Sequence, residues 1–329
     1  MGCDVRLFWA DRYGRERGIY EFAEGQFFVQ VEGEVDFSLD IPKGTGTAQG
    51  CYVMMEDSEF GGIVDSLTVD TSKDTVTIGG RTWHGVLESA LVVPDKGKDY
   101  LEASGECNAI LAMLVARLNL GYIFKASAAD SGFRVSGHRF SRLGSEMGGW
   151  TVMRKMLLSA GAKLQIRYSG ADRRVILSAV PRGNYVDNYM DGESHAFSIT
   201  KGRPVNHLHC MGTGELANRT IVDLYADAKG RVGEVQTLFG QDYNGAVYDS
   251  PSADATALRE DGRKFLEQCQ GELSSCTMRS EESGAYEIDD VVGGSSVEEG
   301  FSVVTSIAQK IAILKDGHVE YETKTETEV

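Results

Sequence analysis

Short runs of alternating apolar and polar residues, joined by glycine-containing connections, make up most of this 329-residue sequence. Between Gly18 and Leu39, for example, Phe27, Val29 and Val31 alternate with polar neighbours. Successive side chains of a β-strand point to opposite faces of a sheet, so a period of two is typical of strands with one buried face. The sequence therefore predicts a protein built mainly from β-sheet, with only a few helical segments.

Three segments carry apolar residues at helical spacing instead. The first includes Ile110 and Leu114 and is expected to stop at Gly121, because glycine is common just beyond the end of a helix. The second helix is predicted over Thr151–Ala160, and the third over Ser252–Gln270. The third contains a glycine near its centre, which lowers its helix propensity.

A tight turn is predicted at Gly79-Gly80, between strands over Ser66–Ile78 and Arg81–Val93. The same alternation predicts further strands over Lys163–Tyr168, Arg174–Val180, His195–Thr200, Leu273–Arg279, Tyr286–Val292, Phe301–Leu314 and Val319–Thr325. The predicted class is α+β, mainly β. Because single cores usually stop growing at about 250 residues, we expect three parts: a β-rich domain over 1–100, an α+β middle over 101–192, and a second β-rich domain over 193–329 with its helix inserted at about 252–270.

The charge of the chain narrows the choice of partners. Forty-nine acidic residues against 33 basic ones give a formal net charge of -16, which argues against a surface that neutralises nucleic-acid phosphates or binds anionic membranes. No window approaches the roughly 18 apolar residues of a membrane-spanning helix, and the N-terminus lacks the apolar run of a signal peptide. The six cysteines form no CxxC pair, so we expect reduced thiols in a soluble protein made in the cytoplasm.

His207, His209 and Cys210 are the residues that most resemble a metal site. On a strand, His207 and His209 share a face while Cys210 points the other way. A third ligand would have to come from His84, His138 or His195, and no sequence spacing supports this. The sequence therefore favours histidines held by packing and hydrogen bonds, with no metal or cofactor site.

Glycines and carboxylates give no better candidate for chemistry. Gly212 and Gly214 follow a predicted strand, but another strand follows them instead of the helix that would hold a pyrophosphate. We expect them to form a turn or bulge, and the segment Gly44–Gly50 to be a loop. Adjacent acidic pairs such as Asp289-Asp290 would face opposite ways on a strand, so solvated surface carboxylates are expected there. The small basic groups are expected to be solvated as well, and they comprise Arg12, Arg15 and Arg17, and Arg134, His138, Arg139 and Arg142.

Four segments, spread in order along the chain, form a recognisable pattern. They are Gly79–Pro94, with its Trp, Gly and Leu; Asn206–Arg219, with Gly-x-Gly-Glu before an Arg; Ala246–Phe265, in which Val-Tyr-Asp leads into a helix; and Tyr286–Gly294, with Asp-Val-Val and glycine. Their order and spacing resemble the tail-hub proteins of phages. The resemblance is to the tail-associated hub family of siphophages that infect Gram-positive bacteria, and of their prophages.

The resemblance implies two tube-like antiparallel β-barrel domains with α+β insertions, assembled as a homotrimer whose barrels continue the tail tube. It implies a structural hub, not an enzyme, that closes the distal tube, guides DNA exit, and contacts the distal tail, tape-measure and fibre or receptor-binding proteins at the virion tail tip. The acidic balance suits a DNA conduit. The candidates for the lumen are Asp223, Asp227, Glu234 and Glu287. Because the sequence ends at Val329 without a fibre or hydrolase domain, those activities are expected in other subunits.

Two other functions fit parts of the sequence. A metal-dependent cell-wall hydrolase would use His207, His209 and a nearby carboxylate. A carbohydrate-binding adhesin would use some of the three tryptophans and thirteen tyrosines, although these form no cluster in the sequence.

Overall fold

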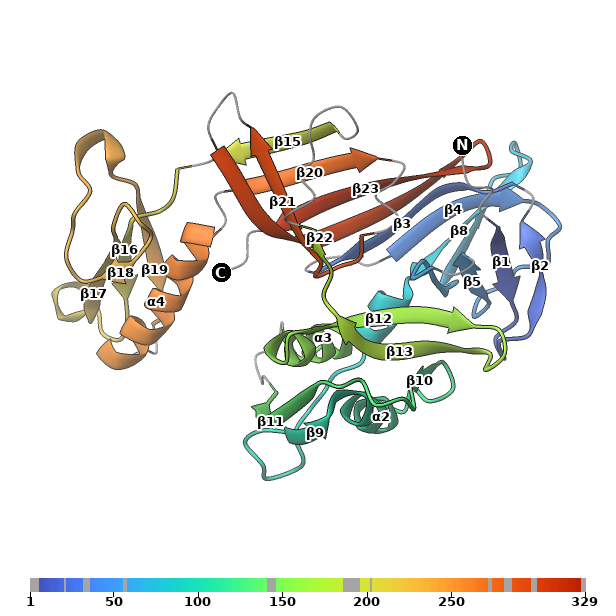
Figure 1. Cartoon of the computed structure of the whole chain (residues 1–329), viewed down its shortest axis with the longest axis horizontal. Helices are drawn as coiled ribbons and strands as arrows, with labels where there is room; N and C mark the ends of the chain where they lie inside the picture. The colour runs from blue at the N-terminus through green and yellow to red at the C-terminus, as the bar shows by residue number, and fades with distance from the viewer. Residues whose placement is uncertain are drawn as a thin grey trace. The chain divides into compact units, whose positions relative to one another are not determined.

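The computed structural model describes residues 6–20, 22–31, 36–55, 58–140, 146–185, 196–201, 203–251, 253–271, 274–280, 286–296 and 301–326. The chain forms two compact units (Figure 1). The first unit comprises Met1–Tyr185, Met278–Val291 and Ile307–Thr323, and the second comprises Val186–Thr277, Val292–Ser306 and Lys324–Val329. The first unit is therefore built from three separate stretches of the sequence.

The largest sheet of the first unit joins residues from both ends of the chain. Part of its strand order is β23-β22-β3-β4-β8-β7. The strands are β3 (Glu24–Gln30), β4 (Asp36–Pro42), β7 (Ser66–Val69), β8 (Thr75–Arg81), β22 (Phe301–Lys315) and β23 (His318–Glu326). In the antiparallel pair β22–β3, Gln309 lies opposite Gln30 and Leu314 opposite Gly25. The alternation in β3 is as predicted, because Phe27 and Val29 are fully buried.

A second sheet of this unit has the order β2-β1-β5-β6. Its strands are β1 (Leu7–Ala10), β2 (Glu16–Tyr20), β5 (Tyr52–Met55) and β6 (Gly61–Ile63). Every residue of β5 is buried, and the core nearby includes Phe60 and Trp83. Tyr52 and Trp83 meet edge to face, with 5.5 Å between their ring centroids.

The middle of the sequence forms helices and short sheets, as predicted. This part contains two helices, α2 (Cys107–Arg117) and α3 (Gly149–Ser159). It also contains five strands, which are β9 (Glu102–Glu106), β10 (Phe124–Ala126), β11 (Arg134–Arg139), β12 (Ala162–Ser169) and β13 (Arg174–Pro181). Strands β9 and β11 pair with each other, and the other sheet has the order β10-β13-β12. The stop predicted at Gly121 is wrong. The helix ends at Arg117, and Asn119 takes the left-handed conformation with φ 56°.

The hairpin predicted around Gly79-Gly80 is wrong. Both glycines lie inside β8, which pairs with β7, and the next residues form helix α1 (Trp83–Glu88). Thr82 caps this helix, because its hydroxyl accepts a hydrogen bond from the amide of Gly85 at 3.3 Å. Gly80 is needed for close approach and not for a turn: a Cβ there would overlap the carbonyl oxygen of Ile63.

The second unit contains a four-stranded sheet covered by one helix (Figure 1). The sheet order is β18-β17-β16-β19, with β16 (His207–Met211), β17 (Ile221–Ala226), β18 (Val232–Gly233) and β19 (Gly245–Asp249). Helix α4 (Ala255–Gly271) packs on one face, and its Leu258 and Leu266 join the buried core of this sheet. Two 3₁₀ turns, Leu216–Asn218 and Gly240–Asp242, connect the strands. The remaining strands of the chain are β14 (Asn184–Tyr185), which lies in the first unit, β15 (Ala196–Lys201), which lies in the second, and β20 (Ser274–Ser280) and β21 (Val291–Ser296), which have residues in both.

The glycine at the centre of α4 has a packing role. A Cβ at Gly262 would lie 2.6 Å from Sγ of Cys210 and 3.0 Å from Cδ1 of Leu224. The helix therefore approaches the sheet so closely at this position that a side chain does not fit. This explains why glycine stands here although it lowers helix propensity.

The observed class is α+β and mainly β, as predicted. The two tube-like barrels and the three-part division of the chain stay predictions. Among the helices of the described ranges, none is long and apolar enough to cross a membrane.

Replacing Gly80 with alanine is expected to cost about 3 kcal/mol or more, because the new methyl group meets the backbone of Ile63 and lies 2.7 Å from the amide nitrogen of Asp65. The matched control is Gly79→Ala, whose Cβ would meet only the hydroxyl of Ser66 at 3.2 Å and the carbonyl of Phe37 at 3.4 Å. Urea unfolding of both variants measures the difference. Equal stabilities would contradict the placement of Gly80 against the neighbouring strand.

Candidate functional site

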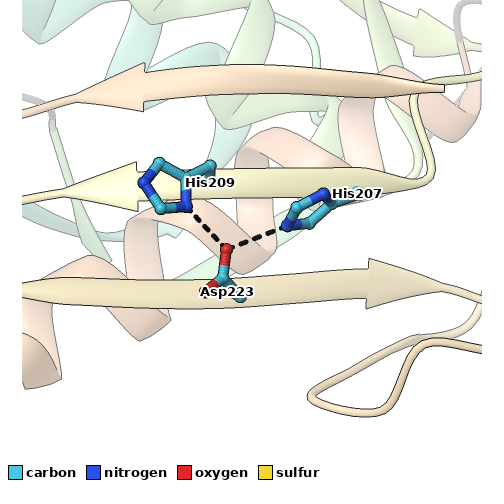
Figure 2. A group of neighbouring side chains, drawn as sticks. All are labelled: His207, His209 and Asp223. Atoms are coloured by element: carbon cyan, nitrogen blue, oxygen red, sulfur yellow. Dashed lines mark hydrogen bonds and ion pairs between the residues drawn. The ribbon is translucent and has the colours of Figure 1, made fainter.

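Two histidines and one aspartate converge on the face of the second unit's sheet that lies opposite α4. His207 and His209 are two residues apart on β16, and Asp223 lies on β17 directly opposite His209. Figure 2 shows both rings turned toward the same carboxylate oxygen. Nε2 of His207 lies 2.9 Å from Oδ1 of Asp223, and Nδ1 of His209 lies 2.7 Å from it. The shared face of the two histidines is as predicted.

Aromatic residues fix the ring of His207. Its other nitrogen, Nδ1, lies 2.7 Å from the hydroxyl of Tyr243. The ring of Tyr225, which is opposite His207 on β17, stacks on it with 4.5 Å between centroids and 13° between planes. These two contacts set the direction in which Nε2 points.

The histidines keep the carboxyl of Asp223 ionised. Partial burial by itself raises the pKa of this group, but the hydrogen bonds and charges of His207 and His209 outweigh burial and hold the pKa below its ordinary value. Each ring nitrogen that faces Oδ1 must therefore donate its proton to a negatively charged oxygen.

Cys210 lies on the other face of β16, as predicted. It is fully buried in the core under α4, and burial raises the pKa of its thiol to about 11. Among the residues that the structure describes, none of the three histidines considered as a third ligand is seen beside this pair. His84 and His138 lie in the first unit, beside Glu59 and Ser159 respectively. His195 lies outside the described residues.

The sequence indicates a carboxylate near the two histidines but does not identify it as Asp223, which it offers only as a candidate for the lumen. The alternation in Ile221–Ala226 was the available signal, because it places Asp223 on the polar face of a strand. The register that sets it opposite His209 depends on a connection of nine residues, Gly212–Thr220, whose geometry the sequence does not specify.

The glycines after β16 form a turn, as predicted. Gly214 has φ +99°, and a Cβ at Gly212 would lie 2.7 Å from Leu258. Strand β17 follows them, preceded by one 3₁₀ turn that is too short to hold a phosphate by its dipole. Arg219 closes this turn by donating from Nε to the carbonyl of Gly212 at 3.1 Å.

The prediction of a strand and solvated carboxylates near Asp289-Asp290 is wrong. The segment before β21 is a turn in which Asp289 has φ 71°, and both aspartates are almost fully buried. Nζ of Lys163 lies 2.6 Å from Oδ1 of Asp290 and 2.8 Å from Oε2 of Glu287. These partners allow the carboxylates to be buried.

The same turn is held by an arginine and by the backbone. Nη2 of Arg154 lies 2.7 Å from Oδ1 of Asp289, and the amide of Gly183 donates to Oδ1 of Asp290 at 2.6 Å. We call the group formed by Arg154, Lys163, Glu287, Asp289 and Asp290 the buried charge cluster. Each carboxylate already accepts from a protein donor, so the group acts as a structural lock within the first unit.

A second buried ion pair contains the only other histidine that contacts a carboxylate among the described residues. Nζ of Lys310 lies 3.1 Å from Oε1 of Glu59, and Nε2 of His84 lies 3.5 Å from Oε2. Burial raises the pKa of Glu59, but the charge of Lys310 and the hydrogen bond and charge of His84 together outweigh burial and leave the pKa well below the ordinary value. This trio is packed into the core, since none of its members is more than 7% exposed.

The other charged candidates pair with basic residues, most of them on the surface. Among the residues considered for a lumen, Asp227 pairs with Arg231, Glu234 with Arg259, and Glu287 with the buried Lys163. The basic groups are also balanced by acids, through the pairs Arg17–Asp11, Arg134–Asp130 and Arg139–Glu102. Arg142 lies outside the described residues, as do two further adjacent acidic pairs for which solvated carboxylates are expected, Glu281-Glu282 and Glu298-Glu299.

No protein-family model matches this sequence, and no curated protein matches it. Solved structures do match its fold. A tail protein from Neisseria meningitidis MC58 aligns with a TM-score of 0.56 at 12% identity, covering 98% of this chain and 97% of that one. The 43 kDa tail protein of prophage MuSo2 from Shewanella oneidensis aligns with a TM-score of 0.57 at 10% identity, covering 98% of both chains.

The chain has the fold of phage tail proteins. A structure of the phage P2 baseplate also contains a matching chain, with a TM-score of 0.50, 12% identity and 98% coverage of both chains. The resemblance to phage tail proteins that the four sequence segments indicated is confirmed at the level of fold. At these identities the tail-protein fold is what is shared, and the residues of the histidine cluster are properties of this chain.

Within this tail-protein fold, Asp290→Asn is expected to destabilise the first unit by about 3 kcal/mol, because it leaves the buried Lys163 with one carboxylate fewer. The matched control is Asp130→Asn, which breaks the exposed pair with Arg134 and is expected to cost about 0.5 kcal/mol or less. Chemical unfolding followed by tryptophan fluorescence measures both. A cost for Asp290→Asn as small as that of the control would contradict the role of the buried charge cluster.

Proposed function

We propose that this chain is a structural component of a phage or prophage tail. In this proposal it serves as the baseplate or tail-tip hub that closes the distal end of the tail tube and guides DNA exit. The observation that carries the proposal is the match of nearly the whole chain, and nearly the whole of each matched chain, to tail proteins from two bacteria. A structural match limited to one domain would show only that this chain and the tail proteins have that domain in common.

The proposed assembly is a homotrimer. In it, residues 1–100 and 193–329 form the two tube-like β-barrel domains, and residues 101–192 form the α+β part between them. Three copies would then provide six related domains around the tube axis. The pairing of β22 with β3 supports one part of this proposal, because it shows that strands from the first and the last part of the sequence belong to the same sheet.

The charge of the chain is suited to this role. A net charge of -16 repels DNA, so a tube lined by such subunits would let the genome pass without binding it. The proposed neighbours are the distal tail protein, the tape-measure protein, and the fibre or receptor-binding proteins. Assembly would take place in the cytoplasm of the bacterial host, and the final location would be the tail tip of the virion.

The structure supports the two alternative functions, a cell-wall hydrolase and an adhesin, to different degrees. A metal-dependent cell-wall hydrolase gains from the position of Asp223 beside His207 and His209. Release of soluble fragments from purified cell wall by the wild-type chain, and not by Asp223→Asn, would favour it. A carbohydrate-binding adhesin is less well supported, because Trp83 and Trp150 are buried and unavailable to stack on a sugar.

Light scattering of the purified chain, alone and with its distal tail protein, tests the proposal. The expected result is a species of three times 35.8 kDa that co-purifies with the distal tail protein. A chain that stays monomeric under both conditions and binds no other tail subunit would contradict the proposed hub.

A further inference from the structure

We propose that His207, His209 and Asp223 form a binding site for a zinc ion on the exposed face of the second unit's sheet. The inference rests on the geometry of β16 and β17 and does not depend on the proposed tail function. One ligand atom from each residue lies within 4.8 Å of the other two. Two imidazoles and a carboxylate are a ligand set that zinc accepts, usually with a fourth position left for water.

The present distances are close to those of a zinc site. Zinc binds nitrogen and oxygen ligands at about 2.0–2.2 Å, so a tetrahedral site separates its ligand atoms by about 3.4 Å. The two ring nitrogens now lie 2.7 and 2.9 Å from Oδ1 of Asp223. The two distances would lengthen by about 0.7 and 0.5 Å, which side-chain rotation on fixed strands provides.

The proton balance of zinc binding is simple. Nε2 of His207 and Nδ1 of His209 now carry the protons donated to Asp223. When zinc takes their place, those two protons leave to solvent, and a ring left without a proton takes one from solvent on its opposite nitrogen, so that it ends neutral. The zinc charge then meets one carboxylate and two neutral rings, and any further proton that a ring carried is released to solvent.

The surroundings of the cluster support its ligands. After the tautomer change, Nδ1–H of His207 would donate to the hydroxyl of Tyr243, which already lies 2.7 Å away. Such outer partners fix ring orientation in metal sites and raise the basicity of the ligand. The strands themselves are held by the buried core beneath them, which includes Leu208, Cys210 and Leu224.

The cluster is open to solvent on one side. The side chains of His209 and Asp223 are 39% and 38% exposed, while that of His207 is 17% exposed. An ion can therefore reach the ligands without unfolding of the sheet, and its fourth position faces outward. The zinc would tie β16 to β17 and offer an exchangeable position on the surface of this unit.

Isothermal titration calorimetry of the full chain, first stripped with EDTA, tests the site with ZnCl₂ as the probe. The expected result is one zinc per chain with a Kd of about 10 µM or lower. Asp223→Asn and His209→Gln are expected to weaken binding more than about 100-fold, and Tyr243→Phe about 10-fold. His138→Gln is the control and should leave the affinity unchanged, because His138 lies outside the cluster.

X-ray absorption of the wild-type zinc complex provides a readout that needs no variant. The expected spectrum shows nitrogen and oxygen ligands with the signature of two imidazoles. Sulfur ligation, the absence of binding to the wild-type chain, or unchanged affinity in folded Asp223→Asn and His209→Gln would each overturn the proposal.

Discussion

The first unit depends on the buried charge cluster. Its chain leaves after Tyr185 and returns at Met278, so the returning stretch must be attached to residues more than a hundred positions earlier. Lys163 and Arg154 provide the attachment by binding the carboxylates of the turn before β21. Such a cluster is costly to desolvate, and it holds its place only because every charged member meets a partner of opposite charge with good geometry.

Backbone geometry reinforces this attachment. Asp289 takes a left-handed conformation, which is unusual for a residue other than glycine. Its amide donates to the carbonyl of Ile307, and the amide of Ile307 donates to the carbonyl of Asp290, both at 2.9 Å. The turn therefore joins the α+β middle of the unit to β22, and β22 in turn pairs with β3.

Local patterns predicted the elements that depend on local physics. Helices α2, α3 and α4 follow from apolar spacing, and β12 and β13 from alternation around a short turn. Helix α1 was missed because Gly79-Gly80 suggested a turn, although those glycines are required by the neighbouring backbone of Ile63. The burial of Asp290 could not be read from the sequence either, since its partner Lys163 lies 127 residues away. The position of Asp223 beside His209 could not be predicted from the sequence either, because it depends on the register between β16 and β17.

The sheet of the second unit shows how one alternating strand serves two purposes. The even-numbered residues Leu208 and Cys210 fill the core beneath α4, whereas His207 and His209 project from the opposite face. The tail-protein fold accounts for the first set, and the chemistry of this particular chain lies in the second. The proposed structural role in a tail and the proposed metal site are therefore compatible, because they use opposite faces of the same strand.

The central claim is that this chain is a structural part of a phage tail. Quantitative mass spectrometry of purified particles, from the phage or induced prophage that encodes the chain, tests it most directly. The account predicts that the chain is present in every preparation, in a fixed ratio to the distal tail protein, and that gold-labelled antibodies against it mark the end of the tail. Particles with complete tails that lack the chain would contradict the account.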